Sequence, residues 1–398
     1  MFRDAAHDLL PDLVALRRRL HRDPEVGLHL PRTQQLVLEA LADLGLEITR
    51  GRELSSVTAV LRGARPGPTV LLRADMDALP ITEETGLEFA ASGATMHACG
   101  HDLHTAGLIG AARLLAGARD RLSGDVVFLF QPGEEGDDGA ALMIAEGALE
   151  ASGTAPVAAY AAHVVPGERG VFRTRPGVLM AGISDLRIEF HGVGGHGSQP
   201  HEAIDPVVGI GELVTALQVM VTRRFPVFDP VVITVTQLAG SDAINVIPER
   251  ASLGATVRTL SRLAEKRVQG LVRELADGIA TAHGCRAVVT FSDDYPALIN
   301  DEVEAEWARE TLAETFGDTR SLLARDPLMA SEDFSRVLEA VPGAFVLLSA
   351  TPAELDPAVA AWNHSARVVF DDGVLGDLAA ALATLAARRL DRAAPLAP

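Results

Sequence analysis

Side chains that can hold a transition-metal ion come directly after apolar runs in the first half of the chain. Carboxylate, imidazole and thiolate groups together are typical of such a site. Zinc fits this mixture of donors best, and manganese, cobalt and nickel also accept them. The donors are Asp75 and Asp77 after residues 70–74, Glu134 and Glu135 after residues 126–130, His163 after residues 157–162, and Cys99 and His101 within segment 96–104.

The positions of these donors predict that they meet in space. Ligands of open α/β sheets bind beyond the carboxyl ends of the strands, and the donors follow runs that read as strands. Cys99 and His101 flank Gly100, whose missing side chain lets the backbone turn so that both can face one ion. We therefore expect one crevice that contains all of them.

Each donor alone has an ordinary explanation. A lone buried cysteine is more often a small hydrophobe than a ligand, and Glu134 with Glu135 would suit the first turn of a helix. His163 could be a half-buried histidine, and Asp75 to Asp77 could form a turn with side-chain bonding to the backbone. The coincidence of four separate sites favours the metal interpretation.

The elements that must position these donors alternate between strand and helix, with helices predicted at residues 105–116 and 331–338 among others. This pattern predicts an α/β fold with a mostly parallel central sheet and helices on both faces. Residues 184–291 instead follow the order β-α-β-β-α-β, which is typical of ferredoxin-like α+β domains. We predict a catalytic metal-binding domain in two parts, residues 1–181 and 294–398, with a ferredoxin-like domain inserted at residues 182–293.

Composition excludes several classes of protein. The 398 residues are 48% hydrophobic, which argues against wholesale disorder. The formal net charge of −19 argues against general nucleic-acid binding. Apolar runs fall short of the roughly 20 residues that a bilayer span requires, and the N-terminus lacks a signal-peptide pattern. The two cysteines, Cys99 and Cys285, cannot form a disulfide framework, and we expect a cytoplasmic protein without membrane contact.

The sequence resembles the hippurate hydrolase and auxin-conjugate hydrolase branch of the dinuclear metal-dependent aminoacylase and carboxypeptidase superfamily. The resemblance runs nearly end to end, and the order of its motifs is highly specific. The motifs are Leu20 to Glu25 (LHRDPE), Arg73 to Pro80 (RADMDALP), His97 to His104 (HACGHDLH), Gln131 to Gly136 (QPGEEG), Gly194 to His201 (GGHGSQPH), Asn245 to Glu249 (NVIPE), Ser331 to Ser335 (SEDFS) and Asn363 to Ala366 (NHSA).

The resemblance implies two divalent metal ions, with the Cys99 thiolate bridging them. It also implies that Glu134 is the general base and that Asp77 orients a ligand imidazole. This agrees with general chemistry, because two ions that share a water lower its pKa and a neighbouring carboxylate can accept its proton. Asp102 is a further candidate for orienting an imidazole. The implied ligands are Cys99, His101, Glu135, His163 and His364.

In the inserted domain the resemblance implies a lid and dimerisation role. His196 corresponds to a histidine that steadies the substrate carbonyl, often in the site of a partner subunit. Asn245 and Arg258 resemble a polar pair on the substrate side, and an Arg suits a carboxylate because its guanidinium can bind both oxygens. The ordinary alternatives are a turn residue for Asn245 and a solvated strand residue for Arg258. We expect a homodimer formed through this domain.

The function that follows is a metal-dependent amidohydrolase that cleaves the amide bond of N-acyl amino acids, such as N-acetyl or N-benzoyl amino acids. A dipeptidase or carboxypeptidase of the same superfamily is the close alternative. A catalytically silent binding or scaffold protein would have lost Glu134 or a ligand, and none is lost. A redox role for Cys99 needs a resolving partner, but Cys285 is assigned to the other domain.

Overall fold

The computed structural model describes residues 2–292 and 295–393, and the chain divides into two compact units. The first unit contains the residues up to Leu179, then Ile299–Asp326, and the residues from Asp333 onward. The second contains Met180–Leu298 and Pro327–Glu332. The predicted domain boundary between residues 293 and 294 lies outside the described residues.

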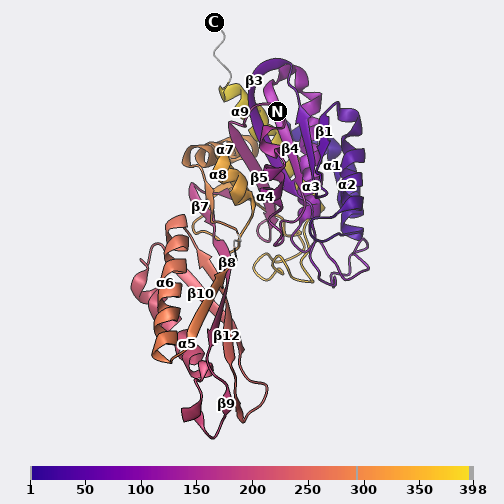
Figure 1. Cartoon of the computed structure of the whole chain (residues 1–398). Helices are drawn as coiled ribbons and strands as arrows, with labels where there is room; N and C mark the ends of the chain where they lie inside the picture. Colours follow the sequence, from indigo (N-terminus) through magenta and orange to yellow (C-terminus); the bar gives the residue numbers. More distant parts are fainter. Residues whose placement is uncertain (1, 293–294, 394–398) are drawn as a thin grey trace. The chain divides into compact units, whose positions relative to one another are not determined.

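An eight-stranded sheet forms the centre of the first unit, with the strand order β1-β2-β4-β3-β5-β16-β6-β15 (Figure 1). Strands β4, β3, β5 and β16 are parallel, whereas β1 and β2 join one side of them in antiparallel pairs. The strands are β1 (Glu47–Arg50), β2 (Val57–Leu61), β3 (Arg65–Asp75), β4 (Ser123–Gln131), β5 (Ala158–Val165), β6 (Phe172–Thr174), β15 (Ser321–Leu323) and β16 (Gly343–Ser349).

Helices cover both faces of this sheet, and its parallel strands are therefore buried along nearly their whole length. Helices α3, α7 and α9 pack on one face, and α4 and α8 pack on the other. Helix α1 packs on α3 and α9, and α2 packs on α3. The helices are α1 (Arg3–Arg22), α2 (Pro31–Leu41), α3 (His101–Gly117), α4 (Gly139–Ala145), α7 (Glu302–Phe316), α8 (Phe334–Ala340) and α9 (Leu375–Ala393).

The second unit contains a four-stranded antiparallel sheet with the order β10-β12-β8-β13. Helices α5 and α6 lie side by side on this sheet (Figure 1). Side chains of β8 alternate between buried and exposed, because one face of the sheet packs on the helices. The elements are β8 (Gly182–His191), α5 (Pro206–Arg224), β10 (Val231–Ala239), β12 (Arg250–Thr259), α6 (Arg262–Ala282) and β13 (Arg286–Phe291).

Two further two-stranded sheets complete the described secondary structure. One pairs β9 (Gly195–His196) with β11 (Val246–Ile247), and the other pairs β7 (Gly177–Met180) with β14 (Leu298–Asn300). Segment Pro327–Glu332, which sequence reasoning placed in the catalytic domain, groups with the second unit. Long-range contacts account for this grouping, because the Ala181 amide donates to the carbonyl of Leu328 at 2.9 Å and Arg258 Nη1 donates to Ser331 Oγ at 3.2 Å.

The predicted fold class is confirmed: a mixed, mostly parallel eight-stranded sheet is accompanied by a separate small antiparallel sheet. Two predicted helices begin elsewhere than expected. Helix α3 begins at His101 rather than at residue 105, and α8 begins at Phe334 rather than at residue 331. Asp333 accepts hydrogen bonds from buried groups of neighbouring segments, which fixes it outside the helix. No helix within the described residues has the length and apolar character needed to cross a bilayer.

Close packing of the middle of α3 against α1 and α9 fixes the position of that helix. At Gly110 an added Cβ would lie 2.7 Å from Ala379 Cβ and 2.8 Å from Leu13 Cδ1. Both neighbours are buried in the core, so neither can move into solvent. The three helices can therefore approach this closely only while residue 110 is glycine.

Gly110→Val should lower the free energy of unfolding by about 2 kcal/mol, because the extra methyl groups overpack this contact. The measurement is urea unfolding of the metal-depleted protein. Gly117→Ala is the matched control, since no atom lies within 4 Å of an added Cβ at that position. A Gly110→Val protein as stable as the control would contradict the packing described here.

Candidate metal centre

The predicted ligands meet at the carboxyl ends of the four parallel strands β3, β4, β5 and β16. Cys99 Sγ lies 3.4 Å from His163 Nε2 and 3.3 Å from His364 Nε2. Glu135 Oε1 lies 3.2 Å from His364 Nε2 and 3.9 Å from His101 Nε2. Two donor atoms that each lie about 2.0–2.3 Å from one ion are separated by roughly 3–4 Å. The spacing of these side chains therefore suits shared cations.

Cys99 and His101 are placed by a turn at Gly100, which adopts a left-handed conformation with φ of 87°. A Cβ at this position would collide with the Val164 side chain and lie 3.1 Å from Phe370. Helix α3 begins at the next residue, so His101 projects from its first turn. The sequence interpretation of Gly100 as the turning point between two donors agrees with this conformation.

His163 comes from β5, and its ring orientation is set by a backbone atom beside it. The imidazole Nδ1 lies 2.8 Å from the carbonyl oxygen of Val164, to which it donates a hydrogen bond when Nε2 is unprotonated. This tautomer directs the lone pair of Nε2 toward Cys99. Burial lowers the pKa of His163 well below its usual value, so the ring is neutral as a ligand must be.

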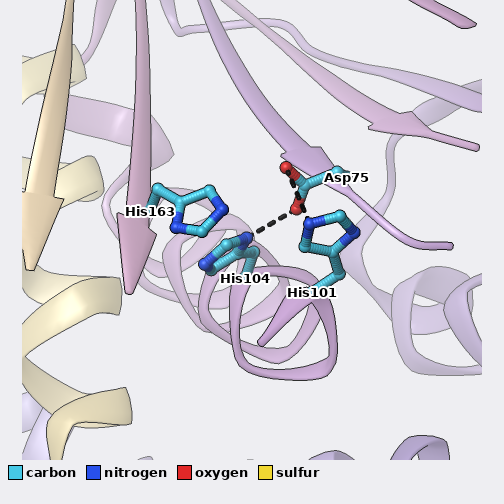
Figure 2. Close-up of side chains that lie close together, drawn as sticks. All are labelled: Asp75, His101, His104 and His163. Carbon is cyan, nitrogen blue, oxygen red and sulfur yellow. Dashed lines mark hydrogen bonds and ion pairs between the residues drawn. The ribbon is translucent and has the colours of Figure 1, made fainter. Parts of the chain in front are cut away.

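Two of these ligands, His101 and His163, also belong to a group of four neighbouring side chains that is completed by Asp75 and His104 (Figure 2). His104 Nδ1 lies 2.5 Å from Asp75 Oδ1, and its Nε2 accepts a hydrogen bond from the Val164 amide at 2.8 Å. Both nitrogens of His104 are therefore used. We infer that His104 and Asp75 position the backbone of β5, and that His101 and His163 remain available to an ion.

Asp75 is itself fixed by a buried network. Arg73 Nη1 donates to Asp75 Oδ2 at 2.5 Å, and Arg73 Nη2 donates to Asp333 Oδ1 at 2.8 Å. Burial alone would raise the pKa of Asp75, but His101, Arg73 and His104 outweigh it and hold that pKa well below the usual value. Asp75 is therefore an ionised carboxylate at neutral pH.

His101 carries the clearest sign of a missing partner. It is fully buried, and neither ring nitrogen makes a hydrogen bond with any residue that the structure describes. Nδ1 lies 3.4 Å from Asp77 Oδ1, whereas Nε2 lies 3.8 Å from Asp75 Oδ2 and 4.0 Å from Glu134 Oε2. Buried polar groups normally have partners. A cation beside Nε2 would satisfy this ring, so the residues fit a metal ion.

Glu134 and Glu135 lie in the turn after β4, not at the start of a helix, since α4 begins only at Gly139. The Glu135 amide donates to Asp77 Oδ2 at 3.0 Å, which ties this turn to the residue expected to orient an imidazole. Glu134, His101 and Glu135 bring their donor atoms within 4.8 Å of one another. Asp77 therefore contacts both His101 and the segment that carries the two glutamates.

His364 follows β16 and has an unusual backbone conformation. Its φ of 70° lies in the left-handed region, where among the described residues only Asp138 and glycines are also found. The His364 amide donates to the Ala98 carbonyl at 2.9 Å. Its imidazole is half exposed, and hydrogen bonds with Cys99 and Glu135 raise its pKa to about 10. Burial and nearby Glu135 raise the pKa of the Cys99 thiol.

The suggestion that Asp102 orients a ligand imidazole is not supported. Asp102 Oδ2 accepts from Arg17 Nε at 2.6 Å and lies 2.8 Å from His21 Nδ1. His21 Nε2 in turn lies 3.1 Å from Glu83 Oε2. Helical geometry explains the difference, because consecutive residues of α3 point in different directions. Asp102 therefore anchors the start of α3 to α1, on which Arg17 and His21 lie.

The three candidates of the inserted domain lie at two ends of the second unit. His196 pairs with Val246 in the β9–β11 sheet, and the Gly197 amide donates to the Asn245 carbonyl at 2.8 Å. Arg258 lies on β12 opposite Ile183, and its Nη1 donates to Ser331 Oγ at 3.2 Å. His196 and Asn245 lie near the opposite end of β12, where the strand begins at Arg250. Asn245 and Arg258, which were expected to form a polar pair on the substrate side, therefore lie apart within one chain.

Sequence reasoning missed several residues that shape the site. His104, Arg17 and Asn363 were seen only as parts of motifs or helical patterns, because their roles depend on contacts across 60 or more positions. The spacing of the two histidines could have predicted that His104 lies at the site, because a residue three positions after His101 lies on the same face of a helix.

The chain is similar to known proteins over most of its length. Residues 71–388 match the model of peptidase family M20/M25/M40. Thermostable carboxypeptidase 1 of Saccharolobus solfataricus is 35% identical over 378 residues, 93% of this chain and 94% of that protein. N-acetyldiaminopimelate deacetylase of Bacillus cytotoxicus is 37% identical over 336 residues, 83% of this chain and 87% of that protein.

The fold is also similar to that of a solved structure. The YXEP protein of Bacillus subtilis, described as a dinuclear metal binding peptidase from the M20 family, has a TM-score of 0.82 and is 30% identical. The match covers 97% of this chain and 99% of that protein.

Zinc binding should release a proton from His364. With a pKa of about 10 this imidazole is protonated at neutral pH in the metal-free protein, and a cation binds only the neutral ring. The apparent zinc affinity should therefore rise from about pH 6 to about pH 9. Calorimetry in two buffers of different ionisation enthalpy counts the released protons. His364→Ala should release fewer, and equal release by both proteins would contradict this assignment.

Proposed function

The chain belongs to peptidase family M20/M25/M40, and from this premise we propose that it is a dinuclear amidohydrolase that cleaves the amide bond of N-acyl amino acids. The observation that carries the proposal is the convergence of a thiol, three imidazoles and a carboxylate on one edge of the sheet. Two divalent ions, zinc, manganese, cobalt or nickel, would be held by Cys99, His101, Glu135, His163 and His364.

The ions, when bound, would polarise the substrate carbonyl and lower the pKa of a water molecule. Glu134 lies beside His101 and Glu135, and we assign it the role of general base. Its carboxylate accepts a proton from the attacking water and returns it to the nitrogen of the departing amino acid. Asp77 keeps the His101 ring in place through its contact with Nδ1.

The substrate class rests on several supports. The motifs resemble enzymes that act on hippurate and auxin conjugates, and a relative 37% identical is named as a deacetylase of an N-acetylated amino acid. The guanidinium of Arg258 would suit the free carboxylate of such a substrate. A carboxypeptidase is the second candidate, because a relative 35% identical carries that name. The size of the acyl pocket would separate the two activities.

The inserted domain is proposed to form a homodimer and to complete the site of a partner. Arg250 and Arg258 are eight residues apart along β12, which corresponds to about 26 Å at the rise of a strand. His196 and Asn245 lie beyond the Arg250 end. One bound amino acid could not contact both Arg258 and His196 of the same chain. We therefore propose that Arg258 and the pair of His196 and Asn245 reach a given substrate from different subunits, with His196 and Asn245 serving the site of a partner.

A substrate panel on metal-depleted protein tests the activity. With each divalent ion restored, N-acetyl, N-benzoyl and indole-acetyl amino acids should be hydrolysed faster than simple dipeptides. Glu134→Ala should retain its metal while turnover falls roughly 10²–10⁴-fold, whereas Glu135→Ala should lose metal as well. The proposal fails if no acyl amide is hydrolysed in a metal-dependent way, and unchanged turnover in Glu134→Ala would exclude that residue as the base.

Mixed dimers test the shared site. His196→Ala and Glu134→Ala should each be nearly inactive, but co-expression should restore about one quarter of the wild-type activity, because half of the dimers are hybrids with one intact site. Sedimentation of the wild-type protein checks the dimer itself. A monomer at working concentration, or isolated hybrids without activity, would contradict the assignment of His196 to a partner's site.

A further inference from the structure

The side-chain amide of Asn363 joins two segments that carry proposed ligands. Its Nδ2 donates to the carbonyl oxygen of Cys99 at 3.2 Å and to that of Val164 at 3.1 Å. The same nitrogen lies 3.7 Å from Cys99 Sγ. Asn363 directly precedes His364 in the chain, so one amide group connects three segments that are distant in sequence.

The carbonyl oxygen of Val164, which accepts a hydrogen bond from Asn363, also binds a proposed metal ligand. It accepts the hydrogen bond of His163 Nδ1, the bond that orients this ring toward Cys99. The Val164 amide is fixed separately by His104 Nε2. Asn363 therefore binds to the backbone atom that determines where His163 points. A displacement of Asn363 would disturb the ring as well as the Cys99 backbone.

The backbone at the next residue explains why such an anchor is needed. His364 has a φ of 70°, a conformation that residues other than glycine rarely adopt. Such conformations persist only when surrounding contacts enforce them. The enforcing contacts are the hydrogen bonds of Asn363 and the bond from the His364 amide to Ala98. Together they direct His364 Nε2 to within 3.3 Å of Cys99 Sγ.

We propose that Asn363 is a positioning residue of the metal centre, which sets the separation of His364, His163 and Cys99 before an ion binds. Two N–H groups are required, one for each carbonyl, so neither a carboxylate nor an apolar side chain can replace the amide. This inference rests on the proposed function, since it concerns the ligands of that same site.

The chain offers a matched control in Asn300. This buried residue also donates from Nδ2 to a backbone carbonyl, that of Arg175, at 2.9 Å. Its Oδ1 accepts from the Phe345 amide at 2.7 Å. None of its described hydrogen bonds reaches a proposed ligand. Loss of this amide should weaken folding without changing how the protein holds an ion.

The experiment compares Asn363→Leu with Asn300→Leu, because leucine has a similar volume and no N–H group. Zinc affinity is measured by competition with a chromophoric chelator, and the metal content of each protein is determined directly. Alkylation of Cys99 by iodoacetamide, followed by mass spectrometry with and without zinc, reports whether the thiolate is ligated. Thermal unfolding of the metal-depleted proteins reports stability separately. Asn363→Ala serves as a second variant if Asn363→Leu does not fold.

Asn363→Leu should bind zinc roughly 10–100-fold more weakly, the range seen when groups that hold metal ligands are removed. Its Cys99 should be alkylated at zinc concentrations that protect the wild type. Asn300→Leu should unfold at lower temperature but keep wild-type zinc affinity. Wild-type zinc affinity and wild-type protection of Cys99 in a folded Asn363 variant would overturn this inference alone. A wild-type protein that takes up no metal would overturn the proposed function together with it.

Discussion

Buried donor atoms without a hydrogen-bond partner among the described residues are the constraint on which the organisation of the metal centre depends. Removing imidazole and carboxylate groups from water is unfavourable unless each finds a hydrogen bond or an opposite charge. His101 is fully buried, and neither ring nitrogen hydrogen-bonds to a described residue: Nε2 lies 3.9 Å from Glu135 Oε1 and 4.0 Å from Glu134 Oε2, and Nδ1 only contacts Asp77 Oδ1 at 3.4 Å. A cation at this position would convert mutual repulsion of the neighbouring carboxylates into attraction.

The surroundings of this centre share a common design, in which side chains fix backbone segments and leave the donor atoms free. Asp75 and His104 hold the Val164 amide, Asp102 ties α3 to α1, and Asn363 binds the carbonyls of Cys99 and Val164. Each contact joins a segment that carries a ligand to a different element of the first unit. These contacts therefore hold the ligand-bearing segments in place, while the donor atoms themselves are left for an ion to satisfy.

The sequence was sufficient for the order of the elements and for the convergence of most donors. Parallel strands place their carboxyl ends at one edge, so residues after β3, β4 and β5 had to meet there. His364 was assigned only by resemblance, because it follows β16 by fifteen residues and has no local pattern of its own. The structure places His364 Nε2 3.3 Å from Cys99 Sγ, which brings the Asn363 to Ala366 motif to the metal centre.

The sequence alone could not predict which side chains contact each other when they are far apart in the chain. The direction of Asp102 toward Arg17 depends on how α1 packs on α3. The grouping of segment Pro327–Glu332 with the second unit depends on contacts more than 70 positions apart in the chain, such as the bridge from Leu328 to Met180 and the hydrogen bond from Arg258 to Ser331. Likewise, Asn245 and Arg258 looked like neighbours in function, but the length of β12 separates them. These outcomes are set by tertiary packing, which leaves no periodic pattern in the chain.

Anomalous X-ray diffraction from crystals of the zinc-loaded protein tests the central claim most directly. The account predicts two peaks at the carboxyl edge of the parallel strands, with Cys99 Sγ within about 2.3 Å of both ions and histidine nitrogens at about 2.0–2.1 Å. The absence of any peak there, or peaks that leave Cys99, Glu135, His163 and His364 uncoordinated, would contradict it.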